Sequence, residues 1–555
     1  MTAKFDRYIG GPGTGKTHLI LGSLTEAKKS LGLSHHEVGL CTFTRAGRAE
    51  LSERAADEWG CEVESLTKHG WFRTAHSIAH RQVGVESGSL LQGDEGAEFV
   101  GRAVGGRIVS QYRGDTEQTA YASADGDPTV DVALRAWDLC RSRMTPLSEV
   151  LREWSLVGLV PSLSAAASVI EKYERAKNRE GRVDFTDMVA RFAGVRFTVE
   201  GPEERDPEGD VPEEIRILAI DEAQDSSALI DRVCRRIAAS PRMERVFLTG
   251  DMFQSIYRFG GSDYRHFLSW DAEESVMPQS YRCPPRIMAL GERCIRKMRS
   301  GYRDRKILPA GHDGQIGWVP SADEAVSKID PSESTLILGR CGFSLDDYEE
   351  SLRRNGIPYT WIDKTAATAS LAGYQCLWDL SHGEGVSGEE WASAVAILAV
   401  NSRQHGKLLA HGEKTAWKEG RRSSVDVIRP VADDIMLAGG TESLARLIAA
   451  GAWHEAIEQK RNKEATSWLE SARRFGPEIA SSPKVRLSTI HSAKGAEGDT
   501  VILSTISSAA VTTAREALRE AHDEECRVNY VGVTRARRNL WIVADGGEHS
   551  LELPL

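Results

Sequence analysis

The stretch Gly10-Gly11-Pro12-Gly13-Thr14-Gly15-Lys16-Thr17 decides the fold class. It matches the phosphate-binding pattern GxxxxGK(S/T), in which glycines let backbone N–H groups turn onto phosphate oxygens. The pattern assigns Lys16 to the β- and γ-phosphates and the Thr17 hydroxyl to magnesium. The preceding Arg7-Tyr8-Ile9 is typical of a short strand, and residues 17–29 are typical of a helix whose N-terminus faces the anion. The sequence therefore predicts a P-loop that binds a nucleoside triphosphate.

A second nucleotide element is Ile217-Leu218-Ala219-Ile220-Asp221-Glu222-Ala223-Gln224-Asp225. Its four leading apolar residues predict a buried strand, and two carboxylates follow at the carboxyl end, where ligands of open α/β sheets lie. Asp221 is expected to hold magnesium through water, and Glu222 to orient or deprotonate the attacking water. A solvated pair of loop acids is the alternative, but the P-loop upstream favours the nucleotide interpretation.

Short β-like runs recur along the chain, and each is followed by a helical pattern. Such alternation is typical of parallel α/β sheets, and continuously apolar strands are typical of sheets covered on both faces. The predicted strands are Phe5–Ile9, Val38–Thr42, Ile215–Ile220, Val246–Thr249, Thr335–Leu338, Val485–Ile490 and Leu540–Val543. Helical stretches at roughly 80–190 and 375–480 separate them into two groups, which predicts two α/β cores with helical insertions.

Further motifs lie between these two elements and after the second one. They are Thr42-Phe43-Thr44-Arg45-Ala46, Thr74-Ala75-His76-Ser77, Val183-Asp184-Phe185-Thr186-Asp187-Met188, Gly250-Asp251-Met252-Phe253-Gln254-Ser255-Ile256-Tyr257, Gln279-Ser280-Tyr281-Arg282, Leu338-Gly339-Arg340 with Gly356-Ile357-Pro358-Tyr359, Thr489-Ile490-His491-Ser492-Ala493-Lys494-Gly495-Ala496-Glu497, and Tyr530-Val531-Gly532-Val533-Thr534-Arg535-Ala536. In content and order they resemble the motifs of the UvrD-like helicases of superfamily 1A, from residue 9 to residue 543.

The resemblance implies two RecA-like parallel-sheet P-loop cores, each interrupted by a mainly helical insertion. It places the first core at residues 1–79 and 191–280 and its insertion at 80–190. It places the second core at 281–378 and 484–555, and a reduced helical accessory domain at 379–483.

The same resemblance implies a nucleotide site for ATP and Mg²⁺. Arg282 and Arg535 would complete the charge clamp on the γ-phosphate as arginine fingers, since one lysine and one magnesium leave negative charge uncompensated. Gln254 would sense the γ-phosphate and link it to DNA, Tyr281 would stack on adenine, and Glu497 would also contact the nucleotide. None of the nine residues before Gly10 is glutamine, so adenine recognition rests mainly on Tyr281.

Residues expected to contact a nucleic-acid strand combine aromatic and polar side chains, because stacking and phosphate contacts hold a strand without sequence preference. By resemblance they are Thr42, Phe43, Thr74, His76, Tyr257, Phe259, Thr489 and His491. Phe43 as a core ring and His76 as a structural histidine are the alternatives. Phe259 is followed by Gly260 where the family has arginine, so one contact is missing.

The net charge of −11 taken alone argues against a nucleic-acid binder. Segment Phe197–Glu214 holds eight acidic residues and one arginine, which predicts a solvated acidic loop. In contrast, Arg293–Lys306 carries seven basic residues and one acidic residue and is the candidate basic patch for a strand. The charge of the whole chain therefore does not exclude nucleic acid.

Four functions fit these observations in different degrees. The first is an ATP-driven single-stranded DNA translocase that acts at single-strand/duplex junctions and unwinds 3′ to 5′. The second is an ATPase stimulated by single-stranded DNA that strips or loads proteins with little unwinding, which a reduced accessory domain permits. A catalytically silent DNA-binding subunit conflicts with the intact nucleotide motifs. A P-loop kinase of small molecules conflicts with the later arginine and DNA motifs.

Location and partners follow from composition. No stretch approaches 18 apolar residues, so no membrane span is expected, and Met1–Gly10 lacks a secretory pattern. The nine cysteines form no CxxC pair, which favours reduced thiols and disfavours a zinc ribbon. The expectation is a cytoplasmic protein of bacterial or phage origin. It would act as a monomer, or as an oligomer on DNA, beside replication or repair proteins.

Overall fold

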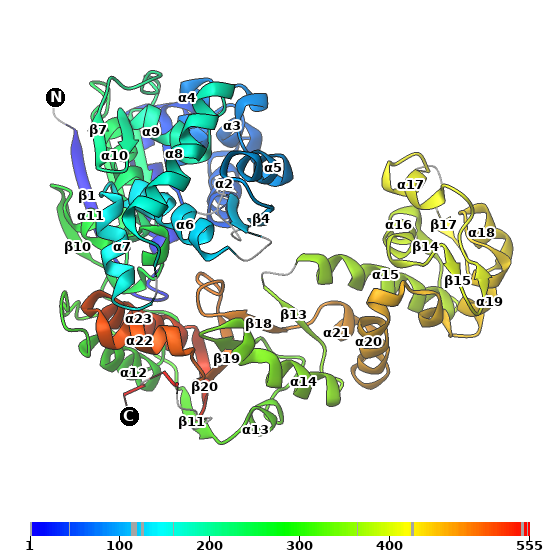
Figure 1. The fold of residues 1–555 in the computed structure, drawn as a ribbon. Helices are drawn as coiled ribbons and strands as arrows, with labels where there is room; N and C mark the ends of the chain where they lie inside the picture. The colour runs from blue at the N-terminus through cyan, green and yellow to red at the C-terminus, as the bar shows by residue number, and fades with distance from the viewer. Residues whose placement is uncertain are drawn as a thin grey trace. The chain divides into compact units, whose positions relative to one another are not determined.

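The computed structural model describes residues 3–43, 45–112, 119–123, 127–158, 160–362, 365–422, 427–544, 549–551 and 553–554. The chain divides into two compact units (Figure 1). The first comprises residues 1–314, 508–534 and 553–555, and the second comprises 315–507 and 535–552. Thr44 of the predicted Thr42–Ala46 motif lies outside the described residues.

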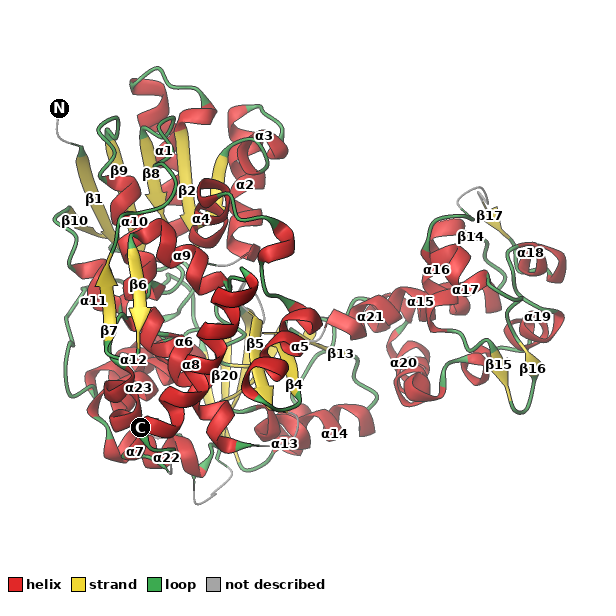
Figure 2. Cartoon of the chain, turned by 45° about the horizontal axis from the view of Figure 1, so that its top comes forward, coloured by secondary structure: helices red, strands yellow, loops and turns green. Residues whose placement is uncertain are grey.

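A six-stranded parallel sheet forms the centre of the first unit, and strands β1, β9, β8 and β2 lie side by side in Figure 2. Across the sheet the order is β10 (Glu273–Val276), β1 (Lys4–Ile9), β9 (Arg245–Gly250), β8 (Ile217–Ile220), β2 (Val38–Thr42) and β3 (Trp71–Thr74). The four strands predicted in this part of the chain are confirmed, whereas β3 and β10 were not predicted.

Both faces of this sheet are covered, because successive side chains of a strand point to opposite sides. Ile217 and Ala219 pack in one buried cluster, and Leu218 and Ile220 pack in the other. The helices of the unit are α1 (Lys16–Ser30), α2 (Arg45–Trp59), α3 (Val63–Thr67), α4 (Ala75–Val83), α5 (Gly93–Val104), α6 (Pro128–Arg143), α7 (Leu147–Ser155), α8 (Leu163–Glu180), α9 (Phe185–Ala193), α10 (Ala228–Ala238), α11 (Tyr264–Leu268), α12 (Pro285–Arg296), α22 (Ala509–Ala517) and α23 (Arg519–Val533).

The insertion expected between β3 and β8 is mainly helical, as predicted. Helices α5 to α8 share a core of their own that includes Phe99, Trp137 and Tyr173. A hairpin of β4 (Ile108–Tyr112) and β5 (Thr119–Ser123) accompanies them.

The acidic segment Phe197–Glu214 is not a loop throughout, so that prediction is wrong for its first half. Strands β6 (Val195–Thr198) and β7 (Gly201–Glu204) pair in an antiparallel hairpin. The hairpin is possible because Phe197 packs against the core while the acidic side chains stay at the surface, and Glu204 forms an ion pair with Arg232.

The second unit contains a second six-stranded parallel sheet. Its order is β11 (Gln315–Val319), β20 (Ala536–Val543), β19 (Gly498–Ser504), β12 (Thr335–Gly339), β18 (Val485–Thr489) and β13 (Tyr359–Trp361). The three strands predicted here are confirmed. The expected class of two parallel α/β cores is therefore correct.

The accessory segment of this unit has an independent core in which Trp391, Trp453 and Trp468 are buried. The helices beside the sheet are α13 (Ala322–Val326) and α14 (Asp346–Arg354). The elements of the accessory segment are α15 (Thr365–Ser381), β14 (Val386–Ser387), α16 (Gly388–Ile397), β15 (Asn401–Ser402), β16 (Gly406–Lys407), α17 (Glu413–Lys418), β17 (Val427–Ile428), α18 (Ala432–Leu437), α19 (Glu442–Ala449), α20 (Asn462–Phe475) and α21 (Pro477–Ser481).

The division between the units differs from the one expected at residue 280. Residues 281–314 and 508–534 group with the first sheet. The reason lies in local contacts: the Ser280 hydroxyl donates to the Pro12 carbonyl, α12 packs against α23, and α23 packs against the 3-10 turn Met252–Gln254. Among the helices that the structure describes, none is both long and apolar enough to cross a lipid bilayer.

Candidate functional site

The predicted P-loop joins β1 to α1 in the first unit. Gly15 is the N-cap of α1 with φ 81°, and Gly13 has φ 65°, so both occupy the left-handed region that suits glycine. A Cβ on Gly13 would lie 2.2 Å from the Cβ of Arg282, so the loop leaves no room for a side chain there. The Thr14 hydroxyl donates to the Gly11 carbonyl at 3.0 Å and closes the turn.

Lys16 lies folded over its own loop. Its Nζ is 3.4 Å from the Gly10 carbonyl oxygen and 3.3 Å from that of Gly11, and 3.9 Å from Oε1 of Glu222. The ammonium is therefore buried against two neutral carbonyl oxygens of the loop, which the charged phosphates of a nucleotide would replace.

The carboxylate of Asp221 follows β8 and is held from two sides. The Thr249 hydroxyl donates to its Oδ1 at 2.5 Å, and the backbone N–H of Glu222 donates to the same oxygen at 3.0 Å. Burial and the neighbouring Glu222 charge raise the pKa of Asp221. A hard divalent cation would stabilise the ionised form, so the donor set of Asp221 and Thr17 fits magnesium.

Glu222 stands in a strained backbone conformation. Its φ of 52° lies in the left-handed region, which is uncommon for any residue but glycine. The Gln224 amide donates to its Oε2 at 2.5 Å, while the Gln224 carbonyl oxygen accepts from the backbone N–H of Asp251 at 3.0 Å. Gln224 therefore connects the predicted catalytic acid to the Gly250–Tyr257 motif.

The Gln279–Arg282 motif lies against the P-loop. The Ser280 hydroxyl donates to the Pro12 carbonyl at 2.7 Å, and the Tyr281 backbone N–H donates to the Gly13 carbonyl at 2.8 Å. The Tyr281 ring is 74% exposed, so it is open to a base. Burial lowers the pKa of Arg282, and the charges of Cys283 and Glu222 oppose that shift.

The carboxylate of Asp251 gathers hydrogen bonds from Gln254 and from two residues that the sequence did not point to. The Gln254 amide donates to Oδ2 of Asp251 at 2.9 Å, and the Tyr530 hydroxyl donates to the same oxygen at 3.2 Å. The other oxygen, Oδ1, accepts from the guanidinium of Arg305. Only the motif membership of Asp251 could have indicated this set, since its partners are far apart in sequence.

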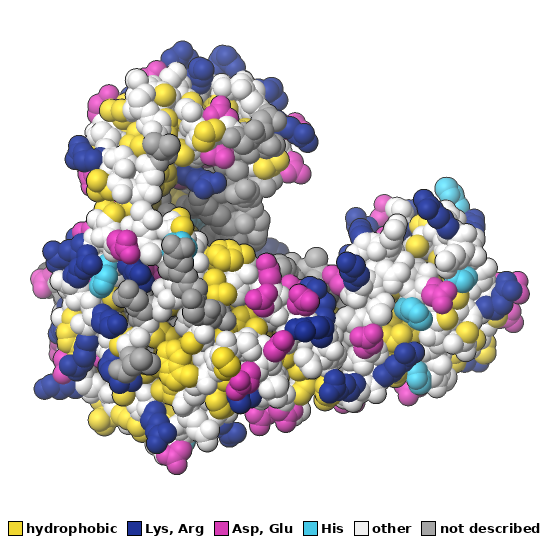
Figure 3. Space-filling model, turned by 60° about the horizontal axis from the view of Figure 1, so that its bottom comes forward, with side chains coloured by type: hydrophobic (Ala, Val, Ile, Leu, Met, Phe, Trp, Pro, Cys, Tyr) yellow, Lys and Arg dark blue, Asp and Glu magenta, His cyan; other side chains and the backbone are white. Residues whose placement is uncertain are grey.

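The basic run Arg293–Lys306 is not one patch, so that prediction is wrong in part. Arg305 is buried, and Arg303 forms an ion pair with Glu274. Arg293, Arg296, Lys297 and Arg299 are exposed on or just after α12. Among the described side chains drawn in Figure 3, lysines and arginines are interspersed with acidic residues over the visible face.

The predicted site residues of the second unit lie in two local groups, one around Arg535 and one at the end of β18. The Gly498 backbone N–H donates to the carbonyl of Arg535 at 3.2 Å, and a guanidinium N–H of Arg535 donates to the Ala496 carbonyl at 3.3 Å. The Glu497 carboxylate accepts from Arg537. Thr489 accepts from the backbone N–H of Ser492 at 3.2 Å at the end of β18. His491, which is partly buried, follows in the same turn. Their roles toward nucleotide and DNA stay predictions.

Residues of the first unit that are predicted to contact a DNA strand lie at the carboxyl ends of β2 and β3. Thr42 and Thr74 are buried, and the Thr74 hydroxyl caps α4 by accepting from Ser77 N–H at 3.2 Å. Phe43 packs partly against the core, which agrees with the structural alternative for this ring. His76 in α4 is partly buried.

Tyr257 and Phe259 form an edge-on aromatic pair with centroids 6.0 Å apart, and Phe259 is 60% exposed. Arg258 between them is anchored from the insertion: Glu153 of α7 pairs with Arg258 at 2.6 Å and with Arg143 at 2.8 Å. A guanidinium N–H of Arg143 also donates to the Arg258 carbonyl at 3.3 Å. The turn that presents Phe259 is therefore held by charged side chains of α6 and α7.

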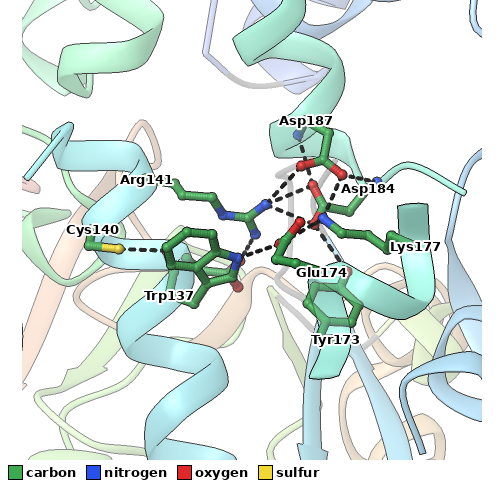
Figure 4. A network of polar contacts seen from close by, with 9 residues as sticks. Trp137, Cys140, Arg141, Tyr173, Glu174, Lys177, Asp184 and Asp187 are labelled. Atoms are coloured by element: carbon green, nitrogen blue, oxygen red, sulfur yellow. Dashed lines mark hydrogen bonds and ion pairs between the residues drawn. The ribbon is translucent and has the colours of Figure 1, made fainter. Parts of the chain in front are cut away.

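The Val183–Met188 motif enters a buried polar network rather than the nucleotide site (Figure 4). Asp184 accepts from Arg141 at 2.8 Å, from Lys177 at 2.9 Å and from the Tyr173 hydroxyl at 3.0 Å. Asp184 and Asp187 also form a reciprocal capping box at the start of α9. The network joins α6 and α8 of the insertion to α9 of the core.

The two carboxylates of the motif have opposite electrostatic character. Burial would raise the pKa of Asp184, but Arg141 and Lys177 lower it well below its ordinary value. Burial and the charge of Asp184 raise the pKa of Asp187. Glu174, Asp184 and Asp187 offer oxygens close enough to share an ion, yet Arg141 and Lys177 already neutralise them, so the cluster is structural.

Two family models match this chain in the regions that carry the site. The UvrD/REP helicase N-terminal domain matches residues 8–122 and 143–274, and the UvrD-like helicase C-terminal domain matches residues 455–545. Together they span more than half of the chain. The chain belongs to the UvrD-like helicase family. The two parallel sheets are thus the two RecA-like cores of a superfamily 1A helicase.

Several of its relatives are mycobacterial proteins. The chain is 25% identical to "ATP-dependent DNA helicase UvrD2" of Mycobacterium tuberculosis over 582 residues, covering 96% of this chain and 75% of that protein. It is 22% identical to "ATP-dependent DNA helicase UvrD1" of the same species, covering 63% of this chain and 47% of that protein. The UvrD1 protein of Mycobacterium leprae is likewise 22% identical and covers 63% of this chain and 45% of the relative.

Proposed function

We propose that this UvrD-like helicase is an ATP-dependent translocase on single-stranded DNA that unwinds duplexes 3′ to 5′ from single-strand/duplex junctions. The observation that carries the proposal is the convergence of Lys16, Asp221 and Glu222 at one edge of the first sheet, with Arg282 held against the same P-loop. The relatives' names, which describe ATP-dependent DNA helicases, support the same activity.

The chain's own residues divide the hydrolytic work. Lys16 would exchange the Gly10 and Gly11 carbonyls for phosphate oxygens, and Thr17 and Asp221 would hold magnesium. Bound Mg·ATP supplies the phosphoanhydride bond and an electrophilic γ-phosphorus. Glu222 would hold or deprotonate the attacking water.

Neutralisation of the developing charge falls to arginines. Arg282 already lies beside Gly13, and Arg535 would add a second guanidinium in the nucleotide-bound state. If Arg535 reaches the nucleotide only when the cores close on it, then binding favours the closed state and hydrolysis releases it.

Coupling to DNA would run through the Gly250–Tyr257 motif. Gln254 reports on the γ-phosphate, and the chain from Gln254 to Phe259 is short enough for a shift at one end to move the other. The exposed Phe259 ring offers a stacking surface for a base, which contributes about 1–3 kcal/mol per stack. Stacking and release on successive bases would hand the strand along.

The decisive experiment measures ATP hydrolysis with and without single-stranded DNA, beside unwinding of 3′- and 5′-tailed duplexes. Glu222→Gln serves as the matched inactive variant. We expect stimulation by single-stranded DNA and unwinding from 3′ tails only, both lost in the variant. Stimulation without unwinding would replace the proposal by a stripping or loading ATPase. Absence of hydrolysis would replace it by a silent DNA-binding subunit, and unwinding from 5′ tails alone would reverse the polarity.

A further inference from the structure

Arg305 is an almost completely buried cation in the first unit. Its guanidinium pairs with Asp251 and lies 3.0 Å from Oε1 of Glu292 and 2.9 Å from the Tyr530 hydroxyl. It also stands over the Phe253 ring, 4.5 Å from the centroid. Burial alone would lower the pKa of Arg305, but Asp251, Tyr530 and Glu292 raise it above its ordinary value. The guanidinium is therefore permanently charged and tightly oriented.

This orientation is transmitted to the γ-phosphate sensor. Arg305 binds Oδ1 of Asp251, and Oδ2 of that carboxylate accepts from the Gln254 amide at 2.9 Å. Asp251 itself is fully buried, so without Arg305 its charge would lack its principal compensation. The position of Gln254 thus depends on a carboxylate that Arg305 fixes.

The same short segment reaches the P-loop and α23. A Cβ on Gly11 would lie 2.7 Å from Cδ1 of Ile307 and 3.8 Å from the guanidinium of Arg305, so residues 305–307 pack directly on the loop. The Tyr530 hydroxyl, which donates to Asp251 and also hydrogen-bonds Arg305, belongs to α23, and the chain continues from α23 into Arg535.

We propose that Arg305 is a positioning residue that ties the state of the P-loop to the γ-phosphate sensor Gln254 and to helix α23. It does not touch the nucleotide; it holds the Asp251 carboxylate so that only the Gln254 side chain exchanges between Asp251 and a γ-phosphate. The inference rests on the ATPase activity proposed above, and it adds a residue that lies outside the quoted motifs.

Four variants test this role. Arg305→Gln removes the charge, Arg305→Lys retains it with a different geometry, and Tyr530→Phe removes one hydroxyl from the network without leaving a buried charge unpaired. Arg303→Gln is the matched control, because Arg303 lies two residues away and pairs with Glu274 at the surface. The readouts are kcat, the dissociation constant of a fluorescent ATP analogue, the thermal midpoint, and the ratio of single-stranded DNA affinities with a non-hydrolysable ATP analogue and with ADP.

For Arg305→Gln we expect kcat to fall at least about 30-fold while nucleotide affinity changes less than about threefold. The ratio of DNA affinities should move toward one. Arg305→Lys should restore part of kcat and part of the wild-type ratio of DNA affinities. Tyr530→Phe should reduce kcat about three- to tenfold. Arg303→Gln should match the wild type in both quantities.

A purely structural role predicts a different pattern. If folded Arg305→Gln or Tyr530→Phe protein keeps the wild-type kcat per active site and the wild-type DNA affinity ratio, with only a lower thermal midpoint, the positioning role is wrong. Should Arg305→Gln fail to fold, Tyr530→Phe decides by the same criteria. Failure of the proposed function would instead appear in the wild-type chain, as absence of ATP hydrolysis.

Discussion

The backbone N–H of Tyr281 donates to the carbonyl of Gly13 at 2.8 Å, which fixes an exposed aromatic ring to the phosphate-binding loop. The Ser280 hydroxyl adds a second tether to Pro12 at 2.7 Å. Because the backbone of Tyr281 makes this contact, its aromatic side chain stays available to a ligand. The ring that would read the base is therefore attached by two hydrogen bonds to the loop that would bind the phosphates.

Tyr281→Ala should raise KM for ATP about tenfold and leave kcat nearly unchanged, since base–aromatic stacking contributes about 1–3 kcal/mol. Tyr281→Phe retains the ring and should resemble the wild type. Steady-state kinetics with ATP and GTP measure both effects. An alanine variant with wild-type KM would show that adenine is bound elsewhere.

Arg535→Ala should lower kcat about a thousandfold while the affinity for ATP stays within about threefold, because an arginine finger acts on transition-state charge. Arg538→Ala is the control, since Arg538 lies three residues away and is exposed. Turnover and equilibrium binding of a fluorescent ATP analogue separate the two effects. A parallel loss of affinity and kcat/KM, with kcat intact, would contradict the assignment.

Glu153→Gln should weaken binding of single-stranded DNA about three- to tenfold, because it releases Arg258 and Arg143 and loosens the turn that carries Phe259. Burial would raise the pKa of Glu153, yet the two arginines lower it overall, so the carboxylate is ionised in the wild type. Glu149→Gln on the exposed side of α7 is the control. Fluorescence anisotropy with an oligonucleotide measures the difference, and Phe259→Ala should cause at least as large a loss.

Asp184→Asn should destabilise the first unit by about 3–5 kcal/mol, because it leaves Arg141 and Lys177 buried with insufficient negative charge. Asp187→Asn should cost clearly less, since the raised pKa of Asp187 means that its neutral form is tolerated. Chemical unfolding followed by a near-ultraviolet signal compares the two. Equal losses would show that the two carboxylates share the charge evenly.

The pH dependence of stability should expose Asp187 separately. Burial and the neighbouring Asp184 raise its folded pKa to about 6, so its contribution is fully present below pH 4 and is lost as the pH rises through 6. The stability advantage of the wild type over Asp187→Asn should therefore shrink between about pH 4.5 and pH 7.5. Thermal midpoints of both proteins across that range provide the measurement, and an advantage that grows with pH would reverse the sign.

The nucleotide half of the site was predictable because its chemistry is local in sequence. Gly10–Thr17 and Ile217–Asp225 each carry a strand, a turn and the reacting side chains in one short stretch, so pattern alone predicts the geometry. The seven predicted strands were likewise recognisable from a short stretch of sequence, because each is a run of mainly apolar residues. Strands such as β3 and β10 carry mixed side chains, and their place in a sheet is decided by neighbours distant in sequence.

Burial of charge was not predictable. Arg305 was predicted to belong to a basic patch for a strand, because the partners that make its burial possible, Asp251 and Tyr530, are 54 and 225 positions away. The hairpin of β6 and β7 was missed because eight acidic residues obscured the single ring, Phe197, that attaches it to the core. In both cases composition describes a segment, whereas the outcome depends on what packs against it.

The backbone conformation of Glu222 bears on which substitutions the chain can accept. Its left-handed backbone, φ 52°, is a conformation that glycine adopts without steric cost and that other residues adopt less readily. The hydrolysis proposed above nonetheless needs a carboxylate at this position beside Asp221. A glycine at this position would remove the backbone strain and the proposed catalytic carboxylate in one step, so the strain would be kept only by selection for turnover.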